Sequence, residues 1–387
     1  MSTCAAVSRT LDEPLAGTAA TARTWLLVEQ PGPWGKQALT QSRLDAALGA
    51  ELERSASAHG ARVALIRRPA RADGADGPAA TPGAPRRVFL ARTLPGNAWI
   101  RTALLAEEAL GTLRDLDFAA LDGDRGPAAL PAGWVPYTGD PLALVCTNGR
   151  RDRCCAVLGR PLAARLAAMG GADVWEITHI GGHRFAPTLL TLPGGYAYGR
   201  LDAVRAADVL DAVRAGRVPT EGCRGRSTWD APGQRAELAV REHTGEPEAD
   251  ALTVETVLPA EADRTGGTAR ADGTTRADGT TRADGTARAE GTAPAEGAAR
   301  VGGTTRAAEA VRADPPRPRR WSVTVAHRDG RRWYLTLSEQ TAGTPRPASC
   351  GAEPGPAGSL TVERIVSAAH QAPAAAGTPA SPSVTHP

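Results

Sequence analysis

Two histidines with two glycines between them are the first residues whose types and spacing suggest chemistry. His179 and His183 stand four residues apart, and on a helix this spacing puts both imidazoles on one face, ready to bind a metal ion. Gly181 and Gly182 lie between them, however, and glycine is a poor helix former. The sequence therefore predicts a histidine pair held in a glycine-containing loop.

A cluster of cysteines precedes this loop. The chain has six cysteines, and three of them, Cys146, Cys154 and Cys155, fall within ten residues. Two thiolates and two imidazoles make a complete ligand set for a zinc ion or for a [2Fe-2S] cluster. Because the side chains of adjacent cysteines diverge, we expect one of Cys154 and Cys155 to be a spectator. The residue types alone leave both assignments open.

The elements around these residues predict how the two loops meet. Residues 139–220 follow the order strand, helix, strand, hairpin, helix, which is the order of a thioredoxin-like fold. Cys146 ends the first strand, Cys154 and Cys155 begin the first helix, and the histidine loop follows the second strand. The ends of these strands lie side by side in such a fold. The cysteine and histidine loops are therefore expected to meet at one edge of the sheet.

The N-terminal region, residues 10–135, repeats this alternation without a cysteine in it. A buried strand is predicted over 24–30, an amphipathic helix over 38–60 and a closing helix from 106, with further strands between them. The repetition favours an α/β protein built from two tandem thioredoxin-like domains.

The C-terminal region predicts a small appendage of a β-hairpin and a helix, formed by residues 221–259 and 317–365. Residues 260–316 between these pieces repeat the hexapeptide RADGTT. Its Gly, Thr, Ala and Asp residues cannot bury enough apolar area to offset the entropy of ordering, so we predict a disordered insertion. A disordered tail is also predicted over 366–387.

Composition excludes several classes of function. The net charge of +3 gives no strong case for nucleic-acid binding. No apolar run approaches the ~20 residues that cross a bilayer, and the N-terminus lacks the pattern of a signal peptide. We therefore expect a cytoplasmic protein that contacts no membrane. The oligomeric state is not predicted, and no serine-nucleophile context or carboxylate pair indicates a hydrolase.

Several stretches resemble the sucrase/ferredoxin-like family, whose members carry a thioredoxin-like ferredoxin domain. They are VCTNGRRDRCCAVLGRPLAARL, HIGGHRFAPTLLTLPGGYAYGRL, WLLVEQPGPWG and RGRSTWDAPGQRAELAVR. The resemblance spans about residues 10 to 350, apart from the hexapeptide insertion. It implies a [2Fe-2S] cluster bound by Cys146, Cys155, His179 and His183, with Cys154 as the alternative ligand, in an electron-transfer protein. The word "sucrase" in the family name is no evidence for cleavage of a sugar.

Residues beside these ligands suggest supporting roles. Gly181 and Gly182 would let backbone N–H groups approach the bridging sulfides closely. Asp152 would orient Arg151 or a ligand imidazole. Basic residues surround the site, among them Arg150, Arg151 and Arg184. They form either a solvated basic face or a docking patch for an acidic redox partner protein.

Two other functions remain open at this level. The first is an interaction module stabilised by zinc at the same four residues, without redox activity. The second is a thiol-based redox protein that uses Cys154 or Cys155.

Overall fold

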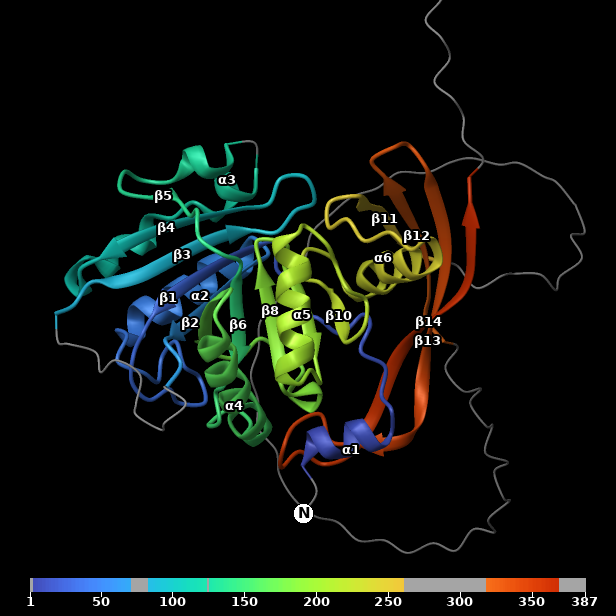
Figure 1. The fold of residues 1–387 in the computed structure, drawn as a ribbon, viewed down its shortest axis with the longest axis horizontal. Helices are drawn as coiled ribbons and strands as arrows, with labels where there is room; N and C mark the ends of the chain where they lie inside the picture. The colour runs from blue at the N-terminus through green and yellow to red at the C-terminus, as the bar shows by residue number, and fades with distance from the viewer. Residues whose placement is uncertain (1–2, 71–82, 124, 261–317, 369–387) are drawn as a thin grey trace, which may run out of the picture. The chain divides into compact units, whose positions relative to one another are not determined.

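The structure is a computed structural model that describes residues 3–70, 83–123, 125–260 and 318–368 (Figure 1). Nearly all of the predicted hexapeptide insertion and most of the predicted tail lie outside these residues. No helix in the described part of the chain is long and apolar enough to cross a membrane. The described residues form two β-sheets with helices, a mixed α/β architecture as predicted.

A sheet of ten strands forms the larger part, in the order β10-β9-β8-β6-β7-β2-β1-β3-β4-β5. Its strands in chain order are β1 (Thr24–Glu29), β2 (Ala61–Arg67), β3 (Arg86–Arg92), β4 (Trp99–Leu105), β5 (Val135–Pro136), β6 (Leu142–Cys146), β7 (Asp173–Ile177), β8 (Thr188–Leu192), β9 (Tyr196–Gly199) and β10 (Cys223–Arg226). Residues 223–226 were assigned to the C-terminal appendage, but they form β10, which pairs with β9 and belongs to this sheet.

The two halves of this sheet repeat one topology. In the first half, β1 is parallel to β2 and antiparallel to β3, and β3 is antiparallel to β4. In the second half, β6 is parallel to β7 and antiparallel to β8, and β8 is antiparallel to β9. Helix α2 (Ala46–Ala58) connects β1 to β2, and α4 (Arg153–Met169) connects β6 to β7. Each half is thus strand, helix, strand, hairpin in the same spatial order.

The halves join edge to edge, so that the two predicted domains share one sheet. Strands β2 and β7 are antiparallel, with Ile66 opposite Ile177. Beyond this pair, the Thr178 amide donates to the Leu65 carbonyl (2.9 Å), and the Leu65 amide donates to Thr178 Oγ1 (3.1 Å). One apolar core runs across the junction and includes Trp25, Phe89, Leu144 and Trp175.

The helices differ from the predicted ones at their ends. Helix α2 begins at Ala46, eight residues later than the predicted start at 38, because the Asp45 carboxylate caps it by accepting from the Leu48 amide (2.7 Å). The predicted closing helix of the first half is a 3₁₀ segment, η1 (Glu107–Asp115), followed by the short α3 (Phe118–Asp122). The remaining short elements are η2 (Gly126–Ala129) and η3 (His183–Phe185), and the second half closes with α5 (Ala203–Arg214).

The C-terminal region is larger than the predicted hairpin and helix. Helix α6 (Ala231–Thr244) packs on a four-stranded antiparallel sheet in the order β11-β12-β13-β14. Its strands are β11 (Leu252–Pro259), β12 (Arg320–His327), β13 (Arg332–Arg346) and β14 (Gly355–Ser367). An N-terminal helix that was not predicted, α1 (Cys4–Thr10), contacts η3 and β13.

Candidate metal centre

The two predicted cysteine ligands meet at the carboxyl end of β6. Cys146 is the last residue of that strand, and Cys155 lies in the first turn of α4; each is 1% exposed. The two thiol groups are near enough to shift each other's pKa. This contact is the main cause that lowers the pKa of Cys146 well below its usual value and raises the pKa of Cys155.

The histidine loop turns sharply because of its two glycines. Gly181 and Gly182 both lie in the left-handed region, with φ of +79° and +73°, where a side chain is strained. The turn brings the His179 and His183 rings into a stack, with centroids 4.1 Å apart and planes 15° apart. The Gly181 amide lies 3.3 Å from His179 Nδ1. The prediction of a histidine pair in a loop therefore agrees with this backbone.

The four side chains form a closed ring of contacts. Cys155 Sγ lies 3.4 Å from His183 Nδ1, and the Cys146 thiol is near enough to His179 and Cys155 for both to lower its pKa. Burial, followed by the charge of His179, lowers the pKa of His183 to about 4. His183 is therefore neutral near pH 7, which is the protonation state of a ligating imidazole.

Asp152 lies between this ring and a second group of thiols. One of its oxygens, the Cys155 sulfur and a ring nitrogen of His183 all lie within 4.8 Å of one another. The carboxylate also caps α4 by accepting from the Cys154 amide (2.8 Å), and it accepts from the Cys350 amide (2.7 Å). Asp152 is 3% exposed, and its hydrogen bonds fix the start of the helix that carries both cysteines.

Cys154 takes part in a different contact from its neighbour Cys155. Its sulfur lies 3.5 Å from the Cys4 sulfur and 3.2 Å from the Cys350 sulfur. The sequence pattern gave no reason to group Cys4 and Cys350 with the site, because they are separated by nearly the whole chain.

A buried arginine behind the histidine loop was also missed. Arg224, in β10, is 0% exposed, and its Nη1 donates to the Gly181 carbonyl (3.1 Å) while Nε donates to Thr18 Oγ1 (3.1 Å). Burial lowers the pKa of Arg224 to about 10, so the guanidinium remains charged at neutral pH. A Cβ atom on Gly182 would lie 2.2 Å from Arg224 Nη2, which explains why a glycine is needed there.

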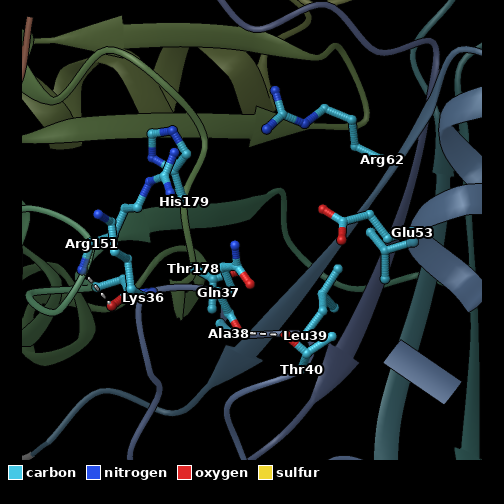
Figure 2. A pocket seen from close by; sticks show the side chains of 12 residues that line it. Lys36, Gln37, Ala38, Leu39, Thr40, Glu53, Arg62, Arg151, Thr178 and His179 are labelled. Carbon is cyan, nitrogen blue, oxygen red and sulfur yellow. Dashed lines mark hydrogen bonds between the residues drawn. The ribbon is translucent and has the colours of Figure 1, made fainter. Parts of the chain in front are cut away.

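One side of the histidine loop borders a cavity of about 370 Å³ (Figure 2). His179 and Arg151 lie together on one side of it near Lys36, and Glu53 and Arg62 lie on the other side. Lys36, Glu53 and Arg62 belong to the first half of the large sheet. His179 is half-buried, whereas His183 is 9% exposed, so His179 is the member of the ring that borders this cavity.

The three predicted docking arginines differ in their surroundings. Arg150 and Arg151 are exposed. Arg184 is half-buried, and its Nε donates to Glu13 Oε1 at 2.7 Å. Arg184 is thus held by the N-terminal segment, whereas the side chains of Arg150 and Arg151 are exposed.

Fold and site together define a mixed α/β protein whose Cys, His and Asp side chains are compatible with metal binding. Residues 15–225 match the family model described as sucrase/ferredoxin-like, which is more than half of the chain. The chain therefore belongs to the sucrase/ferredoxin-like family. Among curated proteins and among solved structures, no match to the chain was found.

Proposed function

We propose that this chain is an electron-transfer protein that binds one [2Fe-2S] cluster through Cys146, Cys155, His179 and His183. When bound, such a cluster accepts and releases single electrons. We further propose that both halves of the large sheet are thioredoxin-like, because each has the strand, helix, strand, hairpin order with matching strand directions. The six free cysteines fit a reducing compartment such as the cytoplasm.

The observation that carries this proposal is the convergence of two thiols and two imidazoles from two separate loops. The donor set fits the cluster, since thiolates and imidazoles are the ligands that [2Fe-2S] centres use. Two neutral imidazoles in place of two thiolates make the ligand set less negative. That difference favours the reduced form relative to a site with four cysteines, as histidine ligation does in Rieske centres.

A buried positive charge near the ring stabilises negative charge at the site. Arg224 is a charged guanidinium with no solvent exposure, and its electrostatic interactions with Cys146 and Cys155 favour their thiolate forms. In a buried environment such an interaction is only weakly screened by salt. The same fixed charge would stabilise an additional electron.

The exposed arginines suggest how a partner would approach. Arg150 and Arg151 extend from the loop between Cys146 and α4, and Arg151 lies beside His179 at the cavity (Figure 2). A small acidic surface on a redox partner would be attracted to this edge, and transient electron-transfer encounters are typically small and electrostatically steered.

The alternatives differ in what they require of the same residues. A thiol redox pair made by Cys154 and Cys155 needs their sulfurs to meet, but each contacts a separate group, which argues against it. Zinc in place of the cluster uses the same four ligands and gives a colourless protein without inorganic sulfide.

The deciding experiment is an anaerobic preparation of the full chain, analysed for iron, acid-labile sulfide and zinc. We expect about two iron and two sulfide per chain, as one [2Fe-2S] cluster requires, and an EPR signal after reduction with dithionite. Iron and sulfide both absent, with zinc bound at the four residues, would overturn the proposal.

A further inference from the structure

A second group of potential ligands shares Asp152 with the Cys155 and His183 contact described above. It consists of the sulfurs of Cys4, Cys154 and Cys350 with the Asp152 carboxylate. The three sulfur–sulfur distances are 3.5 Å from Cys4 to Cys154, 3.5 Å from Cys4 to Cys350 and 3.2 Å from Cys154 to Cys350. The Cys4 sulfur lies 3.7 Å from Asp152 Oδ2.

These residues come from three distant parts of the chain. Cys4 begins α1, Cys154 lies in the first turn of α4, and Cys350 lies in the connection between β13 and β14. Cys4 and Cys154 are each 1% exposed, and their surroundings are apolar, with Ala5 and Ala186 packed against them. Three thiols that converge from separate segments in an apolar environment, around one carboxylate, form more than a chance surface cluster.

We propose that these four residues bind one structural zinc ion. Zinc takes cysteine and carboxylate ligands in tetrahedral sites, with Zn–S distances near 2.3 Å, which places two ligating sulfurs about 3.8 Å apart. The three sulfurs here need to move apart by about 0.3 to 0.6 Å to reach that spacing. Because all three sulfurs contact one another, they fit around a single ion, whereas an iron–sulfur cluster spreads its ligands over several metal atoms.

The surrounding groups offset the charge of such a site. Three thiolates and one carboxylate bring four negative charges, of which zinc cancels two. The site lies at the N-terminus of α4, a helix of 17 residues, whose dipole favours negative charge there. The Asp152 oxygens also accept from two backbone amides, those of Cys154 and Cys350, which orients the carboxylate toward the sulfurs.

The ligand count identifies the role of this ion. Four protein ligands leave no open position, which is the arrangement of a structural rather than a catalytic zinc site. The ion would tie α1 and the connection before β14 to the first turn of α4. That turn also carries Cys155, so the zinc site would fix the position of one ligand of the proposed cluster without exchanging electrons.

The test is metal analysis of the full-length protein together with two single variants. We expect about one zinc per chain in addition to iron, and at least a roughly tenfold loss of zinc in Cys4→Ser and in Cys350→Ser, with iron retained. Cys223→Ser is the matched control, since Cys223 is a buried free cysteine outside both groups. It should retain both metals.

Cobalt substitution adds a readout that does not depend on folding yield. Protein grown with Co²⁺ should show thiolate-to-cobalt absorption that disappears in Cys350→Ser and persists in Cys223→Ser. Two results would overturn the zinc site. The first is that the unmodified protein binds no zinc or cobalt other than metal that the Cys146→Ser variant also loses. The second is an intact mass two hydrogens lighter, mapped to a Cys154–Cys350 disulfide. Because iron is measured separately from zinc, a result that contradicts the zinc site can be told apart from one that contradicts the [2Fe-2S] cluster.

Discussion

The two halves of the ten-stranded sheet have the same topology but differ at the ends of their parallel strands. In the second half, residues 147–152 connect β6 to α4, and the short connection brings cysteines beside the histidine loop. In the first half, residues 30–45 connect β1 to α2, and this longer segment carries Trp34 and no cysteine or histidine. Trp34 is buried, and the Arg67 Cζ atom lies 4.2 Å from the centre of the Trp34 ring. The same scaffold thus carries cysteines and histidines that are compatible with metal binding in one half and apolar packing in the other.

The first half nevertheless contributes to the site of the second. Thr178, which directly precedes His179, is hydrogen-bonded to Leu65 of β2, and Arg67 forms an ion pair with Glu176 (2.7 Å). The first half also supplies most residues of the cavity next to His179. The half without cysteines and histidines at its strand ends therefore lines the cavity and supports the backbone next to His179 in the other half.

The largest effect is expected from removing ligands in the second half. Cys146→Ser, Cys155→Ser, His179→Ala and His183→Ala should each reduce bound iron below about a tenth of the unmodified protein, because each removes one of four ligands. Cys154→Ser should retain its iron, since its sulfur contacts the other group. Iron analysis and visible absorption check both statements; retention by Cys155→Ser with loss in Cys154→Ser would reverse the assignment.

The second prediction concerns the two glycines of the histidine loop. Gly182→Ala should lower the free energy of unfolding by about 3 kcal/mol or more, because it combines a left-handed φ with a clash against buried Arg224. Gly181→Ala is the matched control: its φ is equally unfavourable, but the added Cβ meets only Ala20 Cβ at 3.6 Å, so about 1 kcal/mol is expected. Denaturant unfolding measures both, and equal losses would contradict the packing argument.

The third prediction concerns the hydrogen bond between Leu65 and Thr178 at the junction of the two halves. Thr178→Val keeps the side-chain shape but leaves the Leu65 amide without its acceptor, which should cost about 1–3 kcal/mol of stability. Thr112→Val, on the exposed surface of η1, should change stability by no more than about 0.5 kcal/mol. If Thr178→Val unfolds at the same denaturant concentration as the unmodified protein, the junction does not depend on this bond.

The smallest effect is expected at the exposed edge of the site. The double substitution Arg150→Glu and Arg151→Glu should slow oxidation of the reduced protein by anionic ferricyanide a few-fold and speed oxidation by cationic hexaamminecobalt(III). Both effects should fade at high salt, since the Debye length is about 8 Å at 0.15 M. Arg328→Glu, on the turn between β12 and β13, is the control and should leave both oxidation rates unchanged. If the double variant also leaves both rates unchanged, Arg150 and Arg151 do not form a docking patch.

Much of the fold follows from local patterns in the sequence. Strands β1 to β4 and β6 to β9, with the hairpin after the histidine loop, and helices α4, α5 and α6 lie where periodicity and turn residues predict them. Strands β5 and β10 were not predicted. The start of α2 was wrong by eight residues, because the Asp45 cap outweighs the apolar residues that precede it. Strand β14 and helix α1 had no signal of comparable strength.

What local patterns cannot supply is long-range pairing. The β2–β7 junction depends on two edges that are matched only in three dimensions, so the sequence indicated two domains rather than one sheet. The ring of Cys146, Cys155 and two histidines was accessible because all four flank adjacent strands of one half. The contact of Cys154 with Cys4 and Cys350 was not, because these residues lie 150 and 196 positions away from it.

The antiparallel pairing of β2 with β7 has a consequence for how the two halves stay together. These are equivalent strands of the two halves, so the junction has the local twofold symmetry of a homodimer that assembles edge to edge. When two such subunits become one polypeptide, their association no longer depends on protein concentration. In one polypeptide, the half without cysteines and histidines at its strand ends therefore stays paired with the half that has them at any protein concentration.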